Sequence, residues 1–174
     1  MKAEGQPIFL VEDNDVYRKT LETNLKERIN HNTQIRSFSN GEDCLKNMNM
    51  KPKIVVLDYY LDGSSPTAMN GLEVLKKIKS TRPETMVLML SNQDNMQVAT
   101  DTMKYGAFDY VSKNENSFIR VENAIKNIER IISQTVAIKT GRQVRRVLIG
   151  WIIALIAIII ILEVFFPELM SRNI

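Results

Sequence analysis

The stretch Ile54-Val55-Val56-Leu57-Asp58 places four apolar residues directly before an aspartate. Three further short runs of strand-forming residues also end at a polar residue: residues 8–11 at Glu12 and Asp13, residues 86–90 at Ser91, and residues 110–112 at Lys113. Short apolar runs of this kind are typical of strands in a parallel sheet that is covered on both faces. The carboxyl ends of such strands meet at one edge of the sheet, where open α/β sheets bind ligands. The sequence therefore predicts one crevice lined by carboxylates, a hydroxyl group and an ammonium group.

Strands alternate with helices along the chain. The predicted strands span residues 8–11, 34–38, 54–57, 86–90 and 109–112. The predicted helices span residues 15–29, 72–79 and 95–105, with a short helix ending at residue 45 and a long one beginning near residue 117. Five such β/α units predict an α/β fold with a parallel sheet and helices on both faces. Right-handed crossovers then favour the flavodoxin-like strand order 2-1-3-4-5.

Composition indicates one globular domain with an appendage. The chain has 174 residues, of which 44% are hydrophobic and 25% are charged, as in an ordinary globular protein. A net charge of +3 is too small to indicate a nucleic-acid partner, and we expect none. Cys44 is the only cysteine, so no intramolecular disulfide can form and the bulk of the chain is expected in the cytosol. The only histidine, His31, is expected at the surface, because no second histidine or cysteine nearby completes a metal site.

The polar strand ends suit a divalent cation and a phosphoryl group. Mg²⁺ takes one or two carboxylates, phosphate oxygens and several waters, and Asp13 and Asp58 would supply the carboxylates, with Glu12 assisting directly or through water. A carboxylate beside the metal can attack phosphorus and form an aspartyl phosphate. Asp58 is the expected nucleophile because it ends a fully apolar, central strand. Lys113 would hold the phosphoryl oxygens, and Ser91 would bond to one of them and draw its loop inward, which makes the site a switch.

These motifs, in this order and on these elements, resemble the response regulator receiver domain of bacterial two-component signalling. The resemblance covers about residues 5–133. It is carried by the following residues: Glu12-Asp13, Asp58, Gly71-Leu72-Glu73-Val74-Leu75, Ser91, Gly106-Ala107 and Tyr110-Val111-Ser112-Lys113. One acidic pair alone would be a weak signal, but the full set in register is highly specific.

The resemblance implies a partner, a cofactor and a switch. Asp58 would accept phosphate from a sensor histidine kinase or a phosphotransfer protein, assisted by Ser91 and Lys113. Mg²⁺ would be held by four groups: Glu12, Asp13, Asp58 and the backbone carbonyl of Tyr60. Tyr110 corresponds to the aromatic residue whose inward rotation accompanies the movement of Ser91, so these two residues would form the switch.

Three features depart from the family pattern. Asn92 follows Ser91 where the family usually has a small residue, which is expected to narrow access to the phosphoryl site. Asn114 follows Lys113 where the family usually has a proline in a cis bond. A cis peptide bond before a residue other than proline costs ~2.5–4 kcal/mol. We therefore expect a trans bond between Lys113 and Asn114, and a repositioned Lys113. The loop of residues 59–70 is longer than the family norm and could form a lid or a docking surface.

The C-terminal region gives a separate prediction. Residues 139–146 carry four positive charges and no negative one, and residues 147–162 are free of charged and strongly polar side chains before Glu163. Twenty helical residues span roughly the 30 Å core of a bilayer, and preceding arginines favour a cytoplasmic amino terminus. We therefore expect a transmembrane helix here. The alternative is a soluble hydrophobic helix buried in an oligomer.

The expected organisation follows from these observations. The predicted segments are a receiver domain at residues 1–133, a helical basic linker at residues 134–146, a transmembrane helix at residues 147–166 and a short tail at residues 167–174. Gly141 is expected to break the long last helix, which outruns its sheet and could serve as a connector or the stalk of a homodimer. The expected location is the bacterial inner membrane, with the receiver domain on the cytoplasmic side; the alternative is the cytoplasm.

Three functional hypotheses remain at this point. The first is a phosphoacceptor of a two-component phosphorelay that switches protein–protein contacts through Asp58. It would be membrane-tethered, without a DNA-binding or catalytic output domain, and not an enzyme. The second is a phosphorylation-independent, membrane-bound scaffold with a receiver-like fold. The third, a haloacid-dehalogenase-like phosphatase, normally requires a second aspartate two residues after the nucleophile, where this chain has Tyr60.

Overall fold

The computed structural model of the protein describes residues 6–29, 33–61, 68–92 and 96–165, apart from the side chains of residues 136–146, 159 and 161–165. His31, residues 62–67 of the long loop and the tail at residues 167–174 lie outside this description. The chain divides into two compact units, Met1–Glu129 and Arg130–Ile174. The first unit holds the sheet and the candidate site.

A five-stranded sheet forms the centre of the first unit. Its strands are β1 (Ile8–Val11), β2 (Ile35–Phe38), β3 (Ile54–Asp58), β4 (Met86–Ser91) and β5 (Asp109–Ser112). Every neighbouring pair is parallel, and the order is β2-β1-β3-β4-β5. The predicted parallel sheet and its order are confirmed. All residues of β1 and β3 are buried, which explains why β1 and the first four residues of β3 are apolar rather than alternating.

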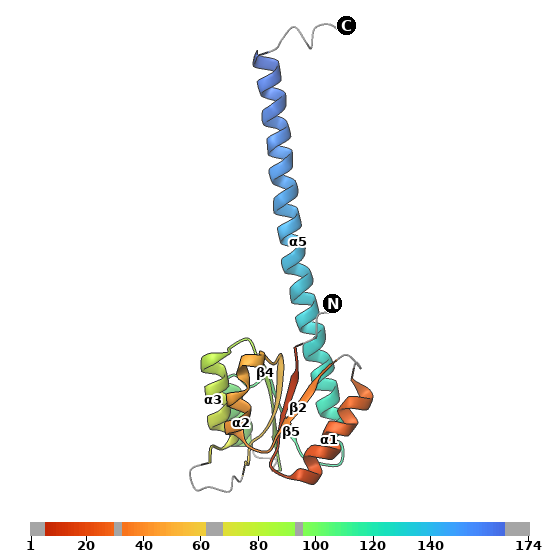
Figure 1. Ribbon diagram of the computed structural model, residues 1–174, viewed down its shortest axis with the longest axis vertical. Coiled ribbons are helices and arrows are strands. Elements are labelled where there is room, and N and C mark those ends of the chain that lie inside the picture. The colour runs from red at the N-terminus through yellow and green to blue at the C-terminus, as the bar shows by residue number, and fades with distance from the viewer. Residues whose placement is uncertain (1–5, 30–32, 62–67, 93–95, 166–174) are drawn as a thin grey trace. The chain divides into compact units, whose positions relative to one another are not determined.

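Helices follow each strand, as the alternating pattern predicts. They are α1 (Asp15–Arg28), α2 (Gly41–Lys46), α3 (Gly71–Thr81), α4 (Met96–Lys104) and α5 (Ser117–Phe165), with a short 3₁₀ helix, η1 (Met48–Met50), after α2. In Figure 1, α2 and α3 lie on one side of the sheet, and α1 and the first turns of α5 lie on the other. The sheet is therefore covered on both faces, and its core packs between two helical layers.

The last helix is longer and more continuous than expected. It runs from Ser117 to Phe165 without interruption, so the break predicted at Gly141 is wrong. One glycine in a helix costs only ~1 kcal/mol relative to alanine. Without a proline beside it, that cost is too small to end a helix that continues on both sides.

The transmembrane helix predicted at residues 147–166 is not found. In the part of the chain that the structure describes, none of the helices combines the length and the apolar character that crossing a bilayer needs. The uncharged run that suggested a span, residues 147–162, has sixteen residues, fewer than the roughly eighteen to twenty that a span takes. The predicted membrane anchor is therefore not supported.

Gly71, the first residue of α3, packs against the end of β3. A Cβ atom added at Gly71 would lie 2.1 Å from the carbonyl oxygen of Asp58 and 2.7 Å from the Cα atom of Tyr59. The Gly71 N–H also donates a hydrogen bond to the Tyr59 carbonyl, at 2.9 Å. Only a residue without a side chain lets the helix begin this close to the strand that carries Asp58.

Replacing Gly71 with alanine should therefore destabilise the first unit. The added methyl group meets backbone rather than a flexible side chain, so we expect Gly71→Ala to lower the free energy of unfolding by about 1–3 kcal/mol. Urea unfolding followed by circular dichroism measures this loss. Gly150→Ala is the matched control, because a Cβ there meets no atom within 4 Å. Equal unfolding midpoints for the two variants would contradict the close packing at Gly71.

Candidate functional site

The carboxyl ends of the strands form a cavity of about 300 Å³. Eight residues line it: Glu12, Asp13, Asn14, Tyr17, Asp58, Tyr60, Asn92 and Lys113. Glu12 and Asp13 follow β1, Asp58 is the last residue of β3, and Lys113 follows β5. The structure thus brings together the carboxylates and the ammonium group that the sequence predicts at one sheet edge.

Three carboxylates converge in this cavity. One oxygen from each of Glu12, Asp13 and Asp58 can be chosen so that all three lie within 4.8 Å of one another. Glu12 and Asp58 are buried, with 0% and 1% of their surface exposed, whereas Asp13 is half-buried. Closely spaced carboxylate oxygens are the ligands that hard divalent cations prefer. The donor set therefore fits a divalent cation such as Mg²⁺.

Lys113 brings a positive charge to the same place. Its Nζ atom lies 2.7 Å from Glu12 Oε2 and 2.7 Å from Asp58 Oδ2, and its side chain is only 7% exposed. The peptide bond to Asn114 is trans, as expected. Lys113 is nevertheless held in the site, because its backbone N–H donates to the Ser91 carbonyl, at 2.7 Å.

The electrostatics of the site favour an additional cation. Burial, and then the charge of Asp58, raise the pKa of Glu12 to about 7. Burial also raises the pKa of Asp58, against the opposing contact with Lys113. For Lys113, burial lowers the pKa, but the contacts with Asp58 and Glu12 prevail and the net shift is upward. Among the described residues at the cavity, three carboxylates face one ammonium group, so the ionised site carries excess negative charge.

Ser91 and Tyr110 lie close to the site but do not line the cavity. Ser91 is buried at the end of β4, where its neighbour Leu90 pairs with Asp58 of β3. Tyr110 on β5 is partly buried against the core. Asn92 does line the cavity; that it narrows access to the phosphoryl site stays a prediction.

The structure adds two residues of α1 that the sequence did not single out. Tyr17 lines the cavity from the first turn of α1, the helix that begins two residues after Asp13. Arg18 donates from Nη1 to the backbone carbonyl of Glu12, at 2.6 Å, and more weakly to that of Asp13, at 3.5 Å. Helical periodicity does not relate these residues to Asp13, because α1 begins only at Asp15, so no sequence pattern marked them.

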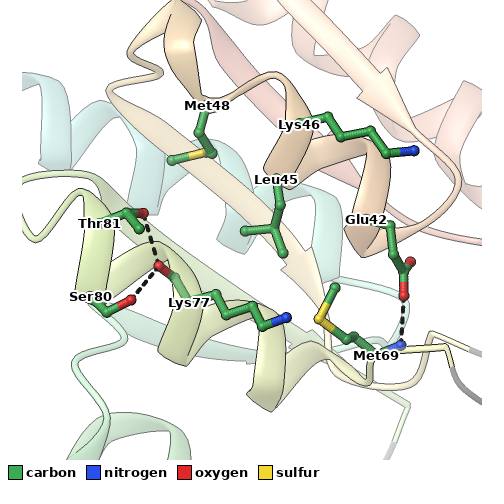
Figure 2. Close-up of a pocket in the computed structure, with 8 residues that line it drawn as sticks. All are labelled: Glu42, Leu45, Lys46, Met48, Met69, Lys77, Ser80 and Thr81. Atoms are coloured by element: carbon green, nitrogen blue, oxygen red, sulfur yellow. Dashed lines mark hydrogen bonds between the residues drawn. The ribbon is translucent and has the colours of Figure 1, made fainter.

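A second cavity, of about 440 Å³, lies between α2 and α3 (Figure 2). Its lining consists of Glu42, Leu45, Lys46, Met48, Met69, Lys77, Ser80 and Thr81. Figure 2 shows that the hydroxyl groups of Ser80 and Thr81 donate to the carbonyl of Lys77, while a backbone N–H donates to the Glu42 carboxylate. The side chains of Glu42, Ser80 and Thr81 are thus hydrogen-bonded to the chain's own backbone. The cavity at the strand ends, with its clustered charges, is therefore the better candidate for a functional site.

Comparison with known sequences decides the family. The sequence model of the response regulator receiver domain matches residues 8–126, which is more than half of the chain. The chain belongs to the response regulator receiver family. The recognition made from the motifs is thereby confirmed.

Individual relatives agree with this assignment. The chain is 32% identical over 111 residues to an NtrX-like response regulator of Rickettsia conorii, a match that covers 63% of this chain and 22% of the relative. The receiver domain of NtrX from Brucella abortus is 28% identical, with a TM-score of 0.58 over 68% of this chain and 98% of that one. The BeF₃-activated DrrB receiver domain is 29% identical, with a TM-score of 0.57 over 70% of this chain and 97% of that one. This chain thus spans less than a quarter of the Rickettsia protein that it matches.

The raised pKa of Glu12 predicts that any binding of Mg²⁺ to this cluster depends on pH. Mg²⁺ needs the ionised carboxylate, so a proton on Glu12 competes with the metal as the pH falls through about 7. For one competing proton, we expect the affinity for Mg²⁺ to be about tenfold weaker at pH 6 than at pH 8. Calorimetric titration with MgCl₂ at pH 6 and at pH 8 measures this affinity.

Glu12→Gln tests whether this carboxylate is the source of the pH dependence. The variant should bind Mg²⁺ more weakly at pH 8 but lose most of the difference between pH 6 and pH 8, because no proton binds to the amide. Equal affinities of the unmodified protein at the two pH values would contradict the expectation.

Proposed function

We propose that the protein is a phosphoacceptor receiver in which Asp58 takes up a phosphoryl group in a Mg²⁺-dependent reaction. The observation that carries this proposal is the position of Asp58. Its carboxylate is buried at the centre of the sheet edge, with the ammonium group of Lys113 at 2.7 Å and two further carboxylates beside it. A nucleophile, a fixed positive charge and a cation site are thus combined within one cavity.

The proposed reaction is a phosphoryl transfer to oxygen. A carboxylate oxygen of Asp58 attacks phosphorus and forms the new P–O bond of an acyl phosphate. The bond between phosphorus and the donor's nitrogen breaks, and its electron pair stays on the donor. Lys113 then contacts phosphoryl oxygens instead of the bare carboxylate and stabilises their charge.

The metal would be held by the acidic cluster. The proposed ligands are Asp13, Asp58 and the backbone carbonyl of Tyr60, with Glu12 assisting directly or through water. Mg²⁺ in this place supplies positive charge that lets an anionic phosphoryl group approach three carboxylates. The fit of the donor set supports this choice, because the excess negative charge of the cluster suits a hard cation.

Ser91 and Tyr110 are the proposed switch. A phosphoryl group adds a charge of about −1.5 to −2 and three acceptor oxygens, and the Ser91 hydroxyl would bond to one of these oxygens. The resulting movement of the loop after β4 would let Tyr110 turn inward and change the surface that a partner contacts. The pairing of β3 with β4 and of β4 with β5 supports this order of events, because it places Asp58, Ser91 and Tyr110 on successive neighbouring strands.

The proposed partners follow from the family. Receiver domains interact with histidine kinases or phosphotransfer proteins, and we propose such a protein as the phosphodonor of Asp58. The NtrX-like response regulator and the transcriptional regulatory protein CssR of Bacillus subtilis, which both match, are longer than this chain. The downstream contact is therefore proposed only as a protein surface that responds to phosphorylation.

Removing the proposed nucleophile should abolish phosphorylation. Asp58→Asn keeps the size of the side chain but lacks the nucleophilic carboxylate, so we expect no incorporation of phosphoryl groups from acetyl phosphate with Mg²⁺. Intact-protein mass spectrometry measures incorporation. Asp43→Asn is the control and should be phosphorylated normally, because Asp43 is an exposed carboxylate of α2 paired with Lys46. Undiminished incorporation in Asp58→Asn would show that another residue accepts the phosphoryl group.

A phosphorylation-independent scaffold is the second candidate function. Asn92 in the cavity lining favours it, since an incoming phosphoryl group must pass this side chain. Addition of beryllofluoride with Mg²⁺ distinguishes the two. A receiver should bind this phosphoryl mimic and change its hydrogen exchange around Ser91 and Tyr110, whereas a scaffold should not respond.

A further inference from the structure

Tyr17 is the one aromatic residue of α1 that lines the phosphorylation cavity, and the reaction described above gives it no role. It lies in the first turn of α1, where its backbone N–H donates to the side chain of the N-cap residue Asn14, at 3.0 Å. The side chain is half-buried, and burial raises the pKa of its phenol. A neutral aromatic ring is therefore fixed in the wall of a strongly charged site.

The ring of Tyr17 faces the ammonium group of Lys113. The Nζ atom lies 4.8 Å from the centre of the ring, within the ~6 Å at which a cation is attracted to an aromatic face. The attraction is strongest when the cation is shielded from water, and the Lys113 side chain is 7% exposed. Lysine has a flexible stem and no fixed donor geometry, so the carboxylates on one side and the ring on the other together define where its charge lies.

The same residue contacts the start of α5. The Tyr17 hydroxyl lies 3.2 Å from Ser117 Oγ, a hydrogen-bonding distance, and Ser117 is 2% exposed. The Tyr17 ring also meets the ring of Phe118 edge to face, with centroids 5.2 Å apart and planes at 66°. Tyr17 therefore joins the charged group nearest to Asp58 with the first turn of the helix that leaves the domain.

We propose that Tyr17 is a positioning residue: its ring holds the Lys113 ammonium beside Asp58, and its hydroxyl couples that ammonium to the first turn of α5. The proposal rests on the phosphoacceptor function proposed above. When Lys113 shifts from the bare carboxylate to phosphoryl oxygens, the ring that it contacts shifts with it, and the bond to Ser117 carries the displacement to α5.

The positioning role is tested by separating the ring from the hydroxyl. Tyr17→Leu removes the ring, and Tyr17→Phe keeps it. We expect Tyr17→Leu to bind beryllofluoride, at saturating Mg²⁺, about threefold to thirtyfold more weakly than the unmodified protein, the range that a shielded cation–π contact gives. Tyr17→Phe should restore the affinity to within about twofold, because phenylalanine offers a similar aromatic face.

The affinity for Mg²⁺ alone separates positioning from general damage. Tyr17 contacts the ammonium group, and an ammonium held less firmly beside Glu12 and Asp58 opposes a metal ion less. Tyr17→Leu should therefore bind Mg²⁺ no more weakly than the unmodified protein does. Val16→Ala is the matched control on the same turn, since Val16 is 76% exposed, and it should change neither affinity. A parallel loss of Mg²⁺ and beryllofluoride affinity in Tyr17→Leu would show a merely structural role and overturn the proposal.

The coupling to α5 is tested on the hydroxyl. Beryllofluoride should change the hydrogen exchange of the first turns of α5 in the unmodified protein, and this change should be reduced in Tyr17→Phe and in Ser117→Ala. An undiminished change in both variants would overturn the coupling.

The outcomes also distinguish this inference from the function on which it rests. An unmodified protein that binds no beryllofluoride would overturn both. If the unmodified protein and Tyr17→Leu bind beryllofluoride equally well, only the role of Tyr17 is wrong.

Discussion

The contact of one lysine with two buried carboxylates is the interaction on which the site depends. Lys113 lies 2.7 Å from both Glu12 and Asp58, and each of these ions has lost most of its water. Removing an ion from water is unfavourable by several kcal/mol unless opposite charge and hydrogen bonds replace the water. One ammonium group cannot compensate three clustered carboxylates. Burial, which Lys113 offsets only in part, therefore raises the pKa values of Glu12 and Asp58. The ionised carboxylate cluster is therefore stabilised by additional positive charge in the cavity where the proposed phosphoryl group would bind.

The sheet makes this unfavourable arrangement possible. Strands β1 and β3 are buried along their entire length, and their packing between helical layers supplies the stability that clustered charges reduce. Gly71 lets α3 begin directly against the backbone of Asp58, so this backbone is held in place while the Asp58 carboxylate faces the cavity. Rigid elements of this kind hold a charged cluster more accurately than loops can.

Sequence reasoning reached the fold and most of the site for the same reason. Strand-forming runs that end in Asp13, Asp58 or Lys113 indicate both a buried strand and the sheet edge at which it ends. The same residues therefore predicted the strand order and the charged groups of the site. Tyr17 and Arg18 were missed because they lie on a helix, where a single aromatic or basic residue has no distinguishing pattern. The break predicted at Gly141 was wrong because one glycine weakens a helix less than assumed. The predicted membrane span is not supported, since no helix among the described residues is long and apolar enough for a bilayer. Roles that depend on movement, such as those of Ser91 and Tyr110, concern a second state that neither sequence nor one structure contains.

Arg18 connects the start of α1 with the backbone of Glu12 and Asp13. Its guanidinium bonds to the backbone carbonyl of Glu12 and also pairs with the carboxylate of Asp15, so the loop after β1 and the first turn of the helix form one network. Thermodynamic linkage then works in both directions. If a protein docked on that turn and altered the position of Arg18, the affinity of the carboxylate cluster for a cation would change. Cation binding would then change the affinity for that protein by the same factor.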